Sequence, residues 1–115
     1  MSNYPSLNLL VAGESLDASG RETIDVLDPS TGEAFASLPK ATPTDLDNAL
    51  EAASRGFKAW RATSADQREA VLRKGAALIR ERAKDIGAAI TREQGKPIKE
   101  AIGEVVRSEE HTSEL

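Results

Sequence analysis

The chain has 115 residues, of which 39% are hydrophobic and 30% charged, with a formal net charge of −4, proportions typical of one small globular domain. The acidic balance and 3% aromatic content disfavour nucleic-acid binding, and the zero cysteines exclude disulfides, thiolate metal sites and a cysteine nucleophile within these residues. No apolar run approaches the ~18 residues of a membrane span, and no signal-peptide pattern begins the chain, so we expect no membrane partner and a cytoplasmic location.

The first forty residues predict short antiparallel strands. Apolar residues from Leu7 to Ala12 form a first strand that Gly13 ends, and alternating patterns over Thr23 to Leu27 and Glu33 to Leu38 predict two more. The run Asp28-Pro29-Ser30-Thr31-Gly32 is a strong turn signal, because aspartate can accept backbone hydrogen bonds, proline presets φ and glycine tolerates positive φ. This region should form an antiparallel meander with a hairpin at residues 28–32.

Amphipathic helices follow, and capping residues mark where they begin. Thr42, with Pro43 and Asp45 behind it, predicts a first helix. Ser64 and Gln67 form a capping box, and the apolar spacing after it predicts one long second helix that Gly95 ends. A third helix begins after Pro97 with Ile98, Ala101, Ile102 and Val105. The expected fold class is therefore α+β, with short strands followed by three amphipathic helices.

Residues 107–115 do not continue the apolar stripe of the third helix. Their sequence, Arg-Ser-Glu-Glu-His-Thr-Ser-Glu-Leu, resembles the translation of a common sequencing-library adapter, so residues 107–115 are interpreted as a non-native tail behind residues 1–106. An ordinary polar C-terminal tail is the alternative. His111 is the only histidine and lies in this tail, without a second histidine or a cysteine with which to share a metal ion.

The residues by themselves define no catalytic, cofactor-binding or metal site. Glu93-Gln94-Gly95-Lys96-Pro97 is the most distinctive short run, and it is typical of a helix end followed by a helix start. It lacks the Lys-Ser/Thr pair of a phosphate-binding loop, and the single scattered glycines form no dinucleotide-binding pattern. Carboxylates are abundant, but none forms a defined pair on an apolar face.

The order of the motifs carries more information than any one of them. Gly13-Glu14 is followed by Val26-Leu27-Asp28-Pro29-Ser30-Thr31-Gly32-Glu33, Asp45-Leu46-Asp47, Ala52-Ala53 and Phe57-Lys58-Ala59-Trp60-Arg61, and then by the run at Glu93 to Pro97 with Glu100-Ala101 and Gly103-Glu104-Val105. This succession resembles the N-terminal segment of the aldehyde dehydrogenase superfamily. The sequence Glu-Gln-Gly-Lys-Pro is similar to the corresponding run in the semialdehyde dehydrogenase branch of this superfamily.

The resemblance implies that this chain is part of an α/β aldehyde dehydrogenase fold. The parent enzyme would oxidise a small aldehyde through a cysteine thiolate, an oxyanion-binding asparagine and a glutamate base, with NAD or NADP as hydride acceptor. The family's catalytic residues lie beyond this segment, and Glu14, Glu33 and Glu93 match none of them. We therefore expect residues 1–106 to be inactive alone and to bind no cofactor, and the parent to be a homo-oligomer.

Two further expectations follow from the resemblance. In some family members a monovalent cation lies near this hairpin, and Glu93 with the Leu27 carbonyl would be this chain's candidates, although a solvated helix-end carboxylate is the simpler interpretation of Glu93. A segment separated from its domain should also expose its helix stripes as an apolar patch, formed by Leu46, Leu50, Phe57, Ile79, Ile86 and Ile90. The alternative function is a small standalone helical module that binds a protein partner through those stripes.

Overall fold

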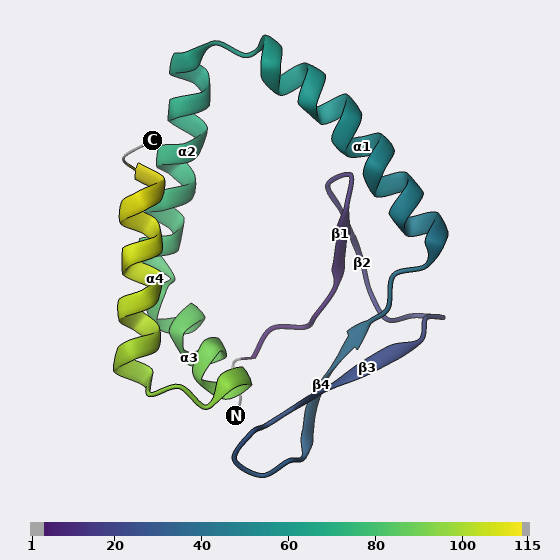
Figure 1. Ribbon diagram of the computed structural model, residues 1–115, viewed down its shortest axis with the longest axis vertical. Coiled ribbons are helices and arrows are strands. Elements are labelled where there is room, and N and C mark those ends of the chain that lie inside the picture. The colour runs from purple at the N-terminus through teal and green to yellow at the C-terminus, as the bar shows by residue number, and fades with distance from the viewer. Residues whose placement is uncertain (1–3, 114–115) are drawn as a thin grey trace. The chain divides into compact units, whose positions relative to one another are not determined.

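The computed structural model describes residues 4–113 and the side chains as far as Ser108. The chain forms two compact units, which are described separately. The hairpin unit contains residues 5–27 and 33–62, and the helical unit contains Tyr4, residues 28–32 and the chain from Thr63 onward. The α+β class expected from the sequence is confirmed, with four strands and four helices in the described part of the chain (Figure 1).

The hairpin unit begins with a strand pair of which the sequence indicated only the first member. Strand β1 (Leu9–Val11) pairs antiparallel with β2 (Glu14–Leu16) through a turn at Ala12 and Gly13. Both turn residues have positive φ, 55° and 82°, as the tight turns that join neighbouring strands require. Alanine rarely adopts this conformation, so the sequence did not indicate that the chain reverses here.

A second strand pair completes the β structure of this unit. Strands β3 (Thr23–Leu27) and β4 (Ala34–Pro39) are antiparallel, with an irregularity between Val26 and Leu27. The expected hairpin is confirmed. The expected meander is wrong, because β1–β2 and β3–β4 form two separate two-stranded sheets.

Helix α1 (Pro43–Ala62) begins where the cap at Thr42 predicts. The Asp45 amide donates to the Thr42 hydroxyl at 3.2 Å, and the Thr42 amide donates back to the Asp45 carboxylate at 2.7 Å. These two bonds satisfy amides that the first helical turn leaves without intrahelical partners. Strand β1 packs against this helix.

The helical unit shows that the long second helix expected from the sequence is two helices. Helix α2 (Ala65–Glu81) has the predicted capping box at Ser64 and Gln67, but it ends at Arg82, whose φ of −97° and ψ of 8° leave the helical region. Helix α3 (Ala83–Gln94) begins immediately afterwards. The alternating apolar spacing continues across the break, so periodicity alone could not reveal it.

Helix α4 (Ile98–Ser113) packs against both α2 and α3, the helices before and after the break at Arg82 (Figure 1). The buried hydrophobic residues of this unit are small: Ala76, Ala83, Ala101 and Val105. Gly87 of α3 lies so close to Ile102 of α4 that an added β-carbon would stand 2.6 Å from the Ile102 Cγ1 atom. Small side chains therefore allow the backbones of three helices to approach closely.

The turn at residues 28–32 belongs to the helical unit and has the structure that its sequence predicts. The Gly32 amide donates to the Asp28 carbonyl at 2.7 Å, the Ser30 amide donates to the Asp28 carboxylate at 2.8 Å, and Gly32 has a φ of 72°. Hydrogen bonds from the Ser30 hydroxyl and amide hold the pKa of Asp28 below its usual value. The ring of Pro29 lies against Gly95, where an added β-carbon would be 3.3 Å from the proline Cγ.

Of the six residues expected to form an exposed apolar patch, the three on α1 are exposed and the three on α2 and α3 are only partly exposed. Leu46, Leu50 and Phe57 are 59%, 61% and 64% exposed. Ile79, Ile86 and Ile90 are of intermediate exposure, in a unit where α4 packs against both α2 and α3. No helix in residues 4–113 is both long enough and apolar enough to cross a membrane.

Candidate functional site

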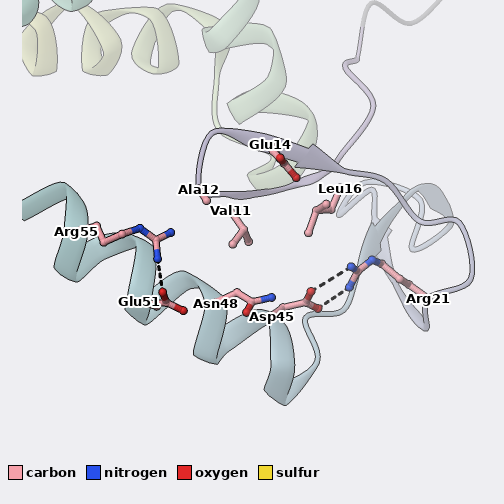
Figure 2. A pocket seen from close by; sticks show the side chains of 9 residues that line it. All are labelled: Val11, Ala12, Glu14, Leu16, Arg21, Asp45, Asn48, Glu51 and Arg55. Atoms are coloured by element: carbon pink, nitrogen blue, oxygen red, sulfur yellow. Dashed lines mark hydrogen bonds and ion pairs between the residues drawn. The ribbon is translucent and has the colours of Figure 1, made fainter.

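A groove in the hairpin unit is a concave surface that could hold a site (Figure 2). Its volume is about 410 Å³. One wall is the β1–β2 hairpin, with Val11 and Leu16 pointing toward α1, and the other is a polar face of α1. The residues that line it are Val11, Ala12, Glu14, Leu16, Arg21, Asp45, Asn48, Glu51 and Arg55.

Arg21 and Asp45 form a two-pronged ion pair at one end of the groove. The Arg21 Nη1 atom lies 2.5 Å from Asp45 Oδ2, and Nη2 lies 3.1 Å from Oδ1. Asp45 is only 8% exposed. A buried carboxylate needs this kind of partner, because an uncompensated charge out of contact with water is strongly unfavourable.

Asp45 also caps the start of α1, so the same carboxylate connects Arg21 with the first turn of the helix. It accepts hydrogen bonds from the Thr42 amide at 2.7 Å and the Thr42 hydroxyl at 2.9 Å. The Arg21 guanidinium, followed by the Thr42 amide and hydroxyl, holds the pKa of Asp45 far below its usual range. A carboxylate held so firmly in its ionised form anchors structure and is unsuited to general-base catalysis near neutral pH.

The other end of the groove contains a second ion pair. Arg55 Nη1 donates to Glu51 Oε1 one helical turn earlier, and both side chains are largely exposed. Four of the charged groups in the groove thus neutralise one another in pairs (Figure 2). The lining contains no serine, threonine, lysine or histidine that could act as a nucleophile or proton shuttle.

The run at Glu93 to Pro97 forms the helix end that its sequence predicts. Gly95 ends α3 with a φ of 73° and donates its amide to the Thr91 carbonyl at 2.8 Å. Lys96 donates to Glu104 of α4. The Glu93 carboxylate accepts a hydrogen bond from the Tyr4 hydroxyl, and burial together with that carboxylate raises the pKa of Tyr4 to about 12.

The cation site suggested by the resemblance stays a prediction. Glu93 lies in the helical unit and Leu27 ends β3 in the hairpin unit, so the structure does not place the two residues relative to each other. Within residues 4–113 no group of three or more histidine, cysteine, aspartate or glutamate side chains could hold a metal ion. The His111 side chain lies outside the described part of the chain.

Sequence reasoning missed the Arg21–Asp45 pair. It identified Asp45 only as part of the start of the first helix and gave Arg21 no role. The partners are 24 residues apart, and no local spacing rule relates a loop arginine to a helix cap at that distance. The only local hint was the Thr42–Asp45 spacing of a capping box.

Comparison with known proteins identifies the family. The profile described as "Aldehyde dehydrogenase family" matches residues 16–114. The chain belongs to the aldehyde dehydrogenase family, as the succession of motifs in its sequence predicted.

Several solved structures support this assignment. Aldehyde dehydrogenase 21 from Physcomitrella patens, in complex with the reaction product succinate, is 36% identical with a TM-score of 0.87, over 95% of this chain and 23% of its own. NADP-dependent glyceraldehyde-3-phosphate dehydrogenase from Bacillus halodurans, complexed with NADP, is 32% identical with a TM-score of 0.88, over 96% and 24%. Succinate-semialdehyde dehydrogenase from Burkholderia pseudomallei is 34% identical with a TM-score of 0.83, over 90% and 21%. The chain therefore spans less than a quarter of each of these three structures.

Proposed function

We propose that this chain is the N-terminal segment of an NAD(P)-dependent aldehyde dehydrogenase that oxidises an aldehyde to a carboxylic acid. The observation that carries the proposal is the family match over residues 16–114. Relatives more than 30% identical include an NADP-dependent glyceraldehyde-3-phosphate dehydrogenase and a succinate-semialdehyde dehydrogenase, which supports an NAD(P)-dependent reaction in the parent protein.

A semialdehyde is the substrate class that we favour for the parent. The run Glu93-Gln94-Gly95-Lys96-Pro97 is similar in sequence to the corresponding run of semialdehyde dehydrogenases. Among the relatives, one is a succinate-semialdehyde dehydrogenase and another was solved with its reaction product succinate.

These residues have a scaffolding role in the parent and take no part in its chemistry. The groove between the β1–β2 hairpin and α1 has paired charges, including an aspartate held in its ionised form. The chain has no cysteine to act as the family's thiolate nucleophile. The nucleophile, the base and the cofactor-binding residues therefore belong to parts of the parent beyond this chain.

The decisive experiment is to read the genomic DNA downstream of codon 106 and to express the uninterrupted frame. The purified parent should reduce NAD or NADP when a semialdehyde is added, and its variant with the nucleophilic cysteine replaced by serine should not. The 115-residue chain should produce no reduced coenzyme under the same conditions. A locus that encodes no cysteine-bearing domain, or coenzyme reduction by the 115-residue chain itself, would contradict the proposal.

The same DNA tests the tail. We propose that residues 107–115 are not native, because they do not continue the apolar stripe that ends at Val105 and Val106. The family match extends to residue 114 and α4 continues to Ser113. The boundary between native and non-native residues must therefore be tested in the genomic DNA. A genomic sequence that encodes the same nine residues would overturn this part of the proposal.

The assembly and location of the parent belong to the same proposal. We expect a homo-oligomer in the cytoplasm, with the small aldehyde as its principal partner. Sedimentation of the purified parent and fractionation of cells that express it with a tag would test the two expectations separately.

A further inference from the structure

The apolar stripe of α1 is left without a partner in the hairpin unit. Leu46, Leu50, Ala53, Phe57 and Trp60 recur at alternating steps of four and three, and all are exposed. This is the spacing of the seam along which two helices pack in a coiled coil. The stripe spans only about two heptads, so a pairing through it would be weak and dependent on concentration.

The β1–β2 hairpin does not cover this stripe, because it packs on a different face of α1. The helix residues that line the groove beneath the hairpin are Asp45, Asn48, Glu51 and Arg55. At 100° per residue, these positions lie on the side of the helix opposite Leu50, Ala53 and Phe57. Helix α1 thus turns its polar face toward its own unit and its apolar face outward.

The charges beside the stripe are arranged asymmetrically along the helix. The flank that contains Asp47, Ser54 and Arg61 has an acidic residue near its beginning, an uncharged residue in the middle and a basic residue near its end, and all three are exposed. In a parallel pair this flank would face the other flank of the second copy, which has Ala49 and Gly56, so Asp47 and Arg61 would gain no charged partner. Two antiparallel helices would place each Asp47 opposite Arg61 of the second copy, at both ends of the pair.

We propose that the 115-residue chain self-associates through α1, as an antiparallel pair of helices related by a twofold axis near Ser54. In this register Leu50 of one copy packs against Trp60 of the second copy. The small Ala53 faces Phe57 of the second copy, which combines a small and a large side chain in one layer. The inference does not depend on the activity of the parent, because it concerns only the surface of this chain.

Sedimentation of the chain over a range of concentrations tests the association. Phe57→Glu and Leu50→Glu should each weaken dimerisation at least about tenfold, since each removes a buried apolar side chain twice per dimer. Val71→Glu is the matched control, because Val71 is an apolar residue of α2 that is 57% exposed. It should leave the association unchanged, and circular dichroism of every variant should show that the helices are retained.

Charge reversal tests the antiparallel arrangement without altering the stripe. Asp47→Lys or Arg61→Glu alone should weaken the dimer several-fold and increase its sensitivity to salt, whereas the double variant should restore the original affinity because both pairs are reversed together. Failure of the double variant to recover would overturn the antiparallel arrangement. A chain that remains monomeric at every concentration, or that associates only with the rest of the parent supplied in trans, would overturn self-association.

Discussion

Different interactions stabilise the interior of each of the two units of this chain. In the helical unit α4 packs on α2 and α3, and the buried residues are Ala76, Ala83, Gly87, Ala101 and Val105. In the hairpin unit the buried residues are Pro39 and Asp45, and the large apolar side chains of α1 point outward. One unit therefore has a small apolar core, whereas the other depends on a charged pair.

The contrast shows that an amphipathic stripe does not by itself specify burial. The apolar side chains of the α1 stripe are larger than those of the small residues buried in the unit formed by α2, α3 and α4. The α1 stripe nevertheless remains exposed, whereas the small residues are buried. What differs is the presence of a helix in the described chain that can cover the stripe. Substitutions in each unit should therefore have separable effects on stability, and hydrogen exchange can follow each unit separately.

The largest effect should come from Gly87→Leu in the helical unit. Even a β-carbon at this position would lie 2.6 Å from Ile102 Cγ1 and 3.1 Å from the Ile102 backbone nitrogen, so a larger side chain must force α3 away from α4. We expect the free energy of unfolding to fall by about 3 kcal/mol, measured by denaturant titration. Amide exchange should accelerate in α3 and α4 and remain unchanged in β1 to β4.

Gly75→Ala is the matched control for that substitution. Gly75 lies within α2, and beyond the backbone of its own helix no atom stands within 4 Å of an added β-carbon. Alanine should stabilise the helix by up to about 1 kcal/mol. An equal loss of stability in both variants would show that close packing at Gly87 is not the reason for its effect.

The second effect, Asp45→Asn, tests the charged pair of the hairpin unit. Asparagine keeps the size of the side chain but leaves the partly buried Arg21 guanidinium without its counter-charge. We expect the melting midpoint to fall by several degrees, with faster exchange at the start of α1. Glu22→Gln removes the partner of an exposed ion pair with Lys40 and should have almost no effect.

The same pair predicts an acid-sensitive contribution to stability. Because folding lowers the pKa of Asp45, the unfolded chain binds its proton more readily than the folded chain. The stabilisation should be complete above the ordinary carboxyl pKa of 3.8 and should be lost progressively as the pH falls below it. Asp45→Asn should flatten this part of the stability profile, and a profile identical to that of the original chain would contradict the role of the pair.

The smallest effect should come from Ser64→Ala at the start of α2. The Ser64 hydroxyl accepts the Gln67 amide at 3.3 Å, and the Gln67 side chain accepts the Ser64 amide at 3.4 Å. Loss of this box should cost about 1 kcal/mol and increase exchange in the first turn of α2. Ser64→Asp, which can still cap the helix, should retain most of the stability. If it were as unstable as the alanine variant, the cap would not explain the effect.

The sequence by itself determined the features whose partners lie within a few residues of each other. The caps at Thr42 and Ser64, the turn at residues 28–32 and the helix end at Gly95 all have the predicted hydrogen bonds. Each depends on the dihedral preferences and short-range hydrogen bonds of adjacent residues, which the local sequence encodes directly. The order of these motifs also sufficed to indicate the family.

Tertiary structure alone decided the features whose partners lie far apart in the chain. Arg21 meets Asp45 across 24 residues, and the break at Arg82 lets α2 and α3 both contact α4. The half-covered isoleucines of α2 and α3 and the exposed stripe of α1 have the same helical periodicity in sequence. They differ because burial depends on which surface another part of the chain reaches, and periodicity specifies only the face that is available.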